Sequence, residues 1–236
     1  MKNSQKVLLP GLTRQLKFLL NEVEIENFNI LVVGSGSVQI AKLLQNKTGK
    51  TLDIIVEDYE SLMNSNLLLK EKGNIQVKLM DFEHTDYNNE TFDLVFAQAS
   101  VSNFRRNKIV KEIKRILKPK SYFIVGEVTK LQNELPNFVA EIFNYSEINP
   151  LLETELIKYY ESRNFEIIAQ KDLSYTLKEY YSTNINRLKT TEKKLSEEEK
   201  TYYKKLLKKI SHESNAYLKL GADKFIGFKT LLLKKN

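Results

Sequence analysis

The chain has 236 residues, of which 42% are hydrophobic, and a formal net charge of +7. This length allows one sizeable hydrophobic core, and the composition is that of a globular protein. The chain has no cysteine, which excludes disulfides, thiolate chemistry and cysteine-based zinc sites. Because it has only two histidines, we expect no metal site.

The hydrophobic pattern predicts strands that alternate with helices. In chain order we expect a helix over 12–21, a strand over 29–33, a helix over 38–46, a strand over 52–56, a helix over 60–72, strands over 75–80 and 92–97, a helix over 106–117, a strand over 121–126, helices over 135–145 and 151–163, a strand over 165–169, helices over 174–191 and 196–219, and a strand over 224–233. This alternation implies parallel strands with helices on both faces. Ligands then bind beyond the carboxyl ends of the strands.

Two of these strand ends carry residues suited to a nucleoside ligand. The first predicted strand is followed by Gly34-Ser35-Gly36, where glycine permits a tight turn and close approach of a ligand to the backbone. The second is followed by Glu57 and Asp58, and an acid at this place can accept both hydroxyls of a ribose. A dinucleotide fingerprint would need a further glycine where Gln39 stands, so the pattern disfavours a dehydrogenase.

Five segments together resemble the class I S-adenosylmethionine-dependent methyltransferases. They are ILVVGSGS, IIVED, KLMDF, FDLVFAQAS and RILKPKSYFIVGE, in the family's order and spacing over roughly residues 29–127. The resemblance implies an α/β fold with a doubly wound, seven-stranded, mostly parallel Rossmann-like sheet, an antiparallel last strand and a helical cap. It implies a single methyltransferase domain over 1–236, made of an N-terminal cofactor-covering helix (1–25), a core of sheet and helices (29–171 and 223–236) and a helical acceptor-side cap (172–222).

The resemblance also implies S-adenosylmethionine as cofactor and S-adenosylhomocysteine as product. The binding residues it implies are Gly34, Ser35 and Gly36 for the methionine part, Glu57, Asp58 and Tyr59 for the ribose, Asp81 and Phe82 for the adenine, the Gln98 backbone for the aminoacyl part and Arg14 for its carboxylate. Two positions depart from the family pattern. Val32 stands where an acid is usual, and Val38 where a third glycine is usual.

The implied reaction is in-line displacement at the sulfonium methyl, which mainly requires that the acceptor be aligned and water excluded. A base is needed only if the acceptor atom must lose a proton. Glu127 is our catalytic candidate, because it ends the strand over 121–126 and the carboxyl end of a parallel strand is the functional edge. We expect His84 and His212 to be surface residues. The insertion 174–219 resembles the acceptor-covering cap of small-molecule methyltransferases, and its tyrosines, among them Tyr202, Tyr203 and Tyr217, either line the acceptor pocket or pack on the sheet.

Two alternatives stay open. Residues 184–236 contain 14 Lys and Arg against 6 Asp and Glu, which would suit an RNA methyltransferase that follows phosphates. Nucleic acid is not favoured, because residues 98–101 are Gln-Ala-Ser-Val rather than an Asn-Pro-Pro-Tyr-like motif. The other alternative, suggested by Val32 and Val38, is a non-catalytic S-adenosylmethionine-binding protein.

We therefore expect a small-molecule methyl acceptor as the partner. The N-terminal apolar stretch stops at Pro10, and no run reaches the roughly 18 apolar residues of a membrane span. A cytoplasmic protein without a transmembrane segment is the expectation. The acceptor atom and the oligomeric state cannot be read from the sequence.

Overall fold

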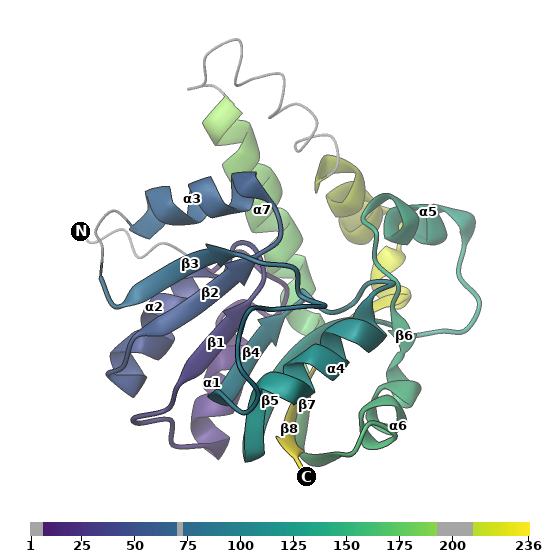
Figure 1. The fold of residues 1–236 in the computed structure, drawn as a ribbon. Coiled ribbons are helices and arrows are strands. Elements are labelled where there is room, and N and C mark those ends of the chain that lie inside the picture. The colour runs from purple at the N-terminus through teal and green to yellow at the C-terminus, as the bar shows by residue number, and fades with distance from the viewer. Residues whose placement is uncertain (1–6, 70–72, 193–209) are drawn as a thin grey trace.

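The computed structural model describes residues 7–69, 73–192 and 210–236 (Figure 1). The strands are β1 (Ile30–Val33), β2 (Leu52–Val56), β3 (Ile75–Leu79), β4 (Phe92–Gln98), β5 (Leu117–Lys130), β6 (Leu151–Leu152), β7 (Phe165–Asp172) and β8 (Ile226–Lys235). The helices are α1 (Arg14–Glu22), α2 (Val38–Thr48), α3 (Tyr59–Leu69), α4 (Arg106–Ile116), α5 (Asn137–Tyr145), α6 (Leu156–Glu161) and α7 (Leu177–Glu192). Residues 210–219 are also helical.

The strands form one sheet in the order β3-β2-β1-β4-β5-β8-β7. Every pairing from β3 to β5 along this order is parallel, and β8 is antiparallel to both β5 and β7. The predicted α/β sheet with an antiparallel last strand is therefore confirmed. Because β1 lies between β2 and β4, the strand order reverses at β1, and the carboxyl ends of β1 and β4 border the switch point where such sheets bind ligands.

Apolar side chains fill both faces of the sheet. Alternate residues of β1 go to opposite faces, as the two-residue period of a strand requires. Leu31 and Val33 pack in the cluster that includes α4 and α6, whereas Ile30 and Val32 pack in the cluster that includes α1 and α2. The sheet is thus covered on both faces, which fixes its carboxyl edge as the open one.

The structure differs from the predicted elements most clearly in two places. The predicted helix 151–163 starts as strand β6, which pairs in parallel with the end of β5 at Thr129 and Lys130, and only its later part forms α6. β5 begins at Leu117 and runs through Pro119, ahead of the strand predicted over 121–126, because Leu117 pairs with Phe92 before a register shift. The sheet consequently has eight strands rather than seven, with β6 beside the main path.

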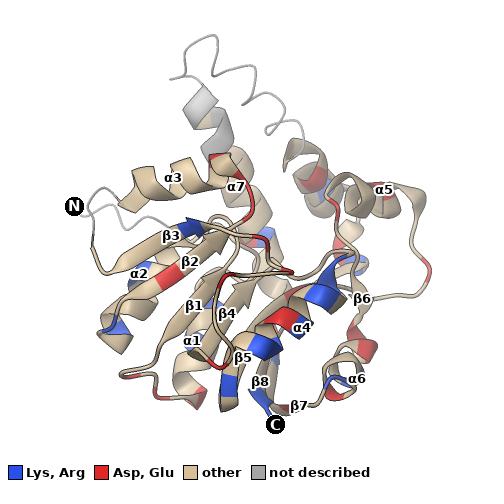
Figure 2. Cartoon of the chain, viewed as in Figure 1, with Lys and Arg blue, Asp and Glu red and all other residues tan. Residues whose placement is uncertain are grey.

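Part of the predicted C-terminal region lies outside the described residues. This holds for the predicted helix start at Ser196, for Tyr202 and Tyr203, and for Lys204, Lys205, Lys208 and Lys209. In the described part, Lys and Arg are spread over α2, β3, α4 and β8 rather than gathered on one element (Figure 2). The described helices include none with both the length and the apolarity for a membrane crossing. The division into N-terminal helix, core and cap stays a prediction.

Candidate active site

The glycine turn after β1 has a backbone that only glycine adopts easily. Gly34 has φ 121° and Gly36 has φ 75°, in the region that favours glycine. A Cβ on Gly34 would lie 2.7 Å from Cβ of Ser100, whose hydroxyl donates to the Val33 carbonyl at 2.7 Å. The turn is therefore held against the loop after β4 and presents bare backbone at the carboxyl edge of the sheet.

Val32 and Val38, the two departures from the family pattern, are core residues. Val32 is fully buried and Val38 nearly so, and both belong to the apolar cluster that includes α1 and α2. An acid at position 32 would place a charge among aliphatic side chains, where an unpaired charge is costly. The departures are therefore explained by packing under the glycine turn.

The acids after β2 and β3 lie close together. Glu57 Oε1 accepts a hydrogen bond of 3.0 Å from the backbone N–H of Phe82, which joins the two strand ends. Glu57 Oε2 pairs closely with Arg105, and Arg105 Nη1 lies 3.5 Å from Asp81 Oδ1. The hydrogen bond that Arg105 donates to Glu57 raises the pKa of Arg105 further, so the guanidinium stays charged. Sequence reasoning missed Arg105; its place in the loop after β4, at the same sheet edge, is the only signal for it.

The neighbouring Asp58 and Tyr59 start α3. Asp58 Oδ1 accepts a 2.7 Å hydrogen bond from the Ser61 backbone N–H, which satisfies one of the free donors at the helix start. Tyr59 is the first residue of the helix, and 68% of it is exposed. The geometry gives Asp58 a capping role, and the ribose contacts of both residues stay predictions.

The segment before α1 crosses the carboxyl end of β4. Gln98 Nε2 donates to the carbonyls of Pro10 at 2.6 Å and Leu12 at 2.9 Å, and Gln15 Nε2 donates to the Ala97 carbonyl at 2.9 Å. The Oε1 atoms of Gln15 and Gln98 are buried, and within the described residues neither has a hydrogen-bond partner. Such orphaned acceptors are costly unless a ligand supplies a donor.

Arg14, the predicted carboxylate ligand, is exposed. It lines a hollow of about 390 Å³ together with Gln39 and Lys42 of α2 and Glu179 of α7, whereas Glu57 lines a different hollow. The structure therefore does not bring Arg14 and Glu57 into one hollow, and the role of Arg14 stays a prediction.

Glu127, the predicted base, is fully buried. Its Oε2 accepts from Arg106 Nε at 2.9 Å and from Ser102 Oγ at 3.1 Å, and its Oε1 accepts from the Tyr160 hydroxyl. Burial and the nearby Glu127 carboxylate hold the pKa of Tyr160 well above its ordinary value, so the phenol remains a donor. This arrangement favours an anchoring role that ties β5 to α4 and α6, and the catalytic role of Glu127 stays a prediction.

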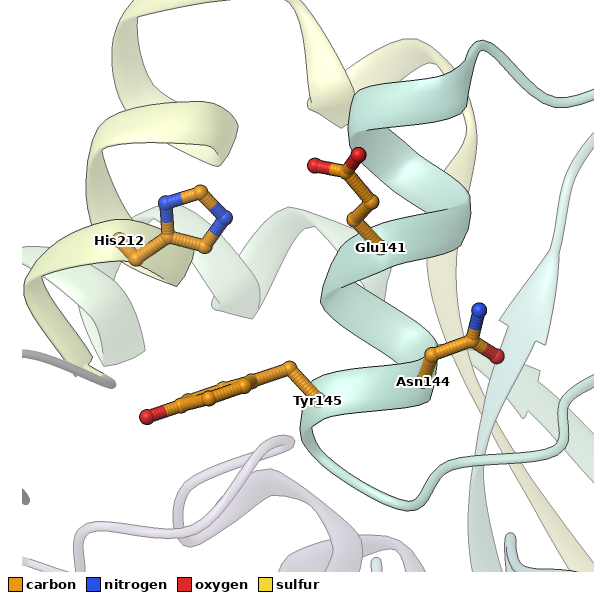
Figure 3. Close-up of a pocket in the computed structure, with 4 residues that line it drawn as sticks. All are labelled: Glu141, Asn144, Tyr145 and His212. Carbon is orange, nitrogen blue, oxygen red and sulfur yellow. The ribbon is translucent and has the colours of Figure 1, made fainter.

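Two hollows flank the end of α5. One, of about 560 Å³, is lined by Glu57, Ser100, Phe104, Arg105, Ser146 and Ile148, among others. The other, of about 660 Å³, has Glu141, Asn144 and Tyr145 of α5 on one side and His212 of the helix 210–219 on the other (Figure 3). Tyr145 lines one hollow and Ser146 the other, so both hollows reach the end of α5.

The helix 210–219 is tied to the end of α5. Ser146 donates a close hydrogen bond to Glu213, next to His212. His212 is exposed, as predicted, but it also faces a hollow. Tyr217 is 8% exposed and packs against Tyr181 at 4.8 Å between ring centroids, so it takes the packing role. Within residues 7–69, 73–192 and 210–236, no three His, Asp or Glu side chains are grouped as a metal ion needs.

Residues 31–125 match the family model described as a methyltransferase domain. The predicted resemblance to class I methyltransferases is confirmed. The matched segment of this methyltransferase fold runs from β1 into β5 and contains the glycine turn, both acids and Arg105. None of the curated protein sequences with which the chain was compared matches it.

Several solved structures share the fold at low sequence identity. Phosphoethanolamine N-methyltransferase 2 of Haemonchus contortus superposes with a TM-score of 0.77 and 15% identity, over 94% of this chain and 52% of that one. Geranyl diphosphate C-methyltransferase of Streptomyces coelicolor A3(2) superposes with a TM-score of 0.68 and 11% identity, over 95% of this chain and 77% of that one. The 4+2 cyclase SpnF superposes with a TM-score of 0.72 and 15% identity, over 94% of this chain and 80% of that one. These likenesses establish the fold, and the cyclase shows that the fold alone does not set the reaction.

Proposed function

We propose that the chain transfers a methyl group from S-adenosylmethionine to a small-molecule acceptor. The observation that carries this proposal is the meeting of Glu57, Asp81 and the Phe82 backbone beyond β2 and β3, within the segment that matches a methyltransferase domain. Two of the solved structures support it, because they are named as methyltransferases of small molecules and are complexes with S-adenosylmethionine or S-adenosylhomocysteine.

The residues at the strand ends fit this cofactor. The bare backbone at Gly34 and Gly36 suits the methionine part, the two oxygens of Glu57 suit a ribose diol, and the exposed carboxylate of Asp81 suits an adenine amino group. The orphaned Oε1 atoms of Gln15 and Gln98 are acceptors for an ammonium group. They would supply the polar partner that Val32 cannot.

S-adenosylmethionine supplies, when bound, a methyl group on a sulfonium that is a good leaving group. The chain's own task is to hold an acceptor in line and to exclude water. We assign the acceptor to the two hollows beside α5, at the end of which Ser146 donates a hydrogen bond to Glu213 of the helix 210–219. If the acceptor atom must lose a proton, His212 or Glu141 can accept it, because both face the hollow (Figure 3). Glu127 is less suited, because both of its oxygens already accept hydrogen bonds.

Calorimetry with S-adenosylmethionine tests the cofactor assignment. We expect Glu57→Ala and Asp81→Ala each to weaken binding by about 1–3 kcal/mol, as the loss of a hydrogen-bond partner does. Glu134→Gln, at an exposed acid outside the site, is the matched control and should leave affinity unchanged. Absence of binding to the unaltered chain at millimolar ligand would reject the proposal, and unchanged affinity in both variants would reject the site.

Methyl transfer separates an enzyme from a binding protein. A methyl-labelled cofactor should label a component of a metabolite pool in the presence of the chain. Binding without transfer to any pool would favour the non-catalytic alternative. Salt-dependent binding to RNA, together with labelled RNA, would instead favour an RNA methyltransferase.

A further inference from the structure

We propose that Arg105 is a latch on the cofactor site, which holds Glu57 when the site is empty and must release it when the ribose binds. The proposal rests on the proposed function, because it concerns the same carboxylates. It adds a residue that competes with the cofactor and thereby sets its affinity.

The guanidinium of Arg105 faces three acids from two strand ends. Its Nη2 pairs closely with Glu57 Oε2, its Nη1 lies 3.5 Å from Asp81 Oδ1, and its Nε lies 3.5 Å from Glu83 Oε1. Its backbone is fixed separately, because the Arg105 N–H donates to Asn103 Oδ1 at 2.8 Å where α4 begins. One side chain therefore covers both acids that we assign to the nucleoside.

Glu57 already has a donor on each oxygen. Oε1 accepts from the Phe82 backbone and Oε2 accepts from Arg105. A ribose diol brings two further O–H donors, and it needs the face of the carboxylate that Arg105 occupies. The Phe82 N–H is fixed by the chain, whereas the Arg105 side chain is 43% exposed and can swing into solvent. Arg105 is therefore the group that yields.

Charge explains why a latch is useful here. Without Arg105, the described cation at this cluster is Lys108, which contacts only Glu83, at 3.0 Å. Three neighbouring carboxylates would then repel one another. Arg105 neutralises these carboxylates and keeps Glu57 oriented before the cofactor binds. The ribose hydroxyls must then displace Arg105 from the Glu57 carboxylate, which lowers the affinity for the cofactor.

S-adenosylhomocysteine is the probe, because it carries the ribose but no sulfonium charge. We expect Arg105→Gln to bind it about two- to five-fold more tightly than the unaltered chain at low salt, the worth of one exposed ion pair. The gain should vanish near 1 M salt, where the Debye length falls to about 3 Å and the latch itself is screened. Arg105→Lys keeps the positive charge, so its affinity for S-adenosylhomocysteine should stay close to that of the unaltered chain.

Lys108→Gln is the matched control, because Lys108 contacts Glu83 without contacting Glu57 and is 72% exposed; its affinity should not change. Thermal unfolding confirms that each variant is folded. Weaker or unchanged binding by a folded Arg105→Gln would overturn the latch while the proposed function stands. Failure of every variant and of the unaltered chain to bind at millimolar ligand would overturn the proposed function and the latch with it.

Discussion

Replacement of Glu127 distinguishes an anchor from a catalytic base. In the structure its carboxylate is fully buried and accepts from Arg106, Ser102 and Tyr160. Arg106 is itself buried, its Nη2 donates to the Asn149 carbonyl at 2.6 Å, and its guanidinium lies over the Tyr159 ring. Glu127→Gln keeps the shape of the side chain but removes the charge that compensates this guanidinium.

The expected loss of stability is large. Removing one partner of a buried ion pair costs about 3–5 kcal/mol, because it leaves an uncompensated charge in the interior. At about 2–4 °C per kcal/mol for a domain of this size, the melting temperature should fall by about 6–20 °C. Tyr160→Phe, which removes one hydrogen bond to the same carboxylate, should cost about 1.5–3 kcal/mol.

Urea unfolding of Glu127→Gln, Tyr160→Phe and the double variant measures these free energies. The double variant should lose less than the sum of the two single losses, since both remove parts of one network. Glu134→Gln, at an exposed acid, should stay within about 0.5 kcal/mol of the unaltered chain. A Glu127→Gln variant of unchanged stability that has lost methyl transfer would refute the anchoring role and support the catalytic one.

Three further predictions concern other contacts. Gly34→Ala should lower the free energy of unfolding by about 1–3 kcal/mol, because a φ of 121° is strained for alanine and the added methyl group meets Ser100. An unchanged urea midpoint would contradict this expectation. Burial raises the pKa of Glu112, but the hydrogen bonds from Arg115 and the Thr85 side chain and backbone outweigh burial and lower it. Its stabilisation is therefore full above the ordinary glutamate pKa of about 4.3 and disappears as the pH falls through the lowered value. Unfolding curves of Glu112→Gln should vary less with pH below about 5, and a slope equal to that of the unaltered chain would argue against the shift. Gln98→Met should cost about 1–3 kcal/mol, because it leaves two backbone carbonyls without donors; faster hydrogen exchange around Leu12 would report the loosened segment.

The sequence alone determined the order of strands and helices and the strand ends that carry the site. β1, β2 and β4 are short apolar runs closed by Gly34, Glu57 and Gln98, and a local pattern of that kind survives in any tertiary context. Since parallel strands bring their carboxyl ends to one edge, the meeting of Glu57 with the residues after β3 followed from the pattern as well.

Tertiary structure alone decided which of these side chains are paired within the protein and which can contact a ligand. The partner of Glu127 on α6 is Tyr160, 33 residues away, and the partner of Glu57 after β4 is Arg105, 48 residues away. β6 likewise forms because the end of β5 offers it a neighbour. Local periodicity carries no information about such pairings. Whether a carboxylate is buried and paired or open to a ligand depends on side chains that reach it from distant segments, and only the folded chain brings these together.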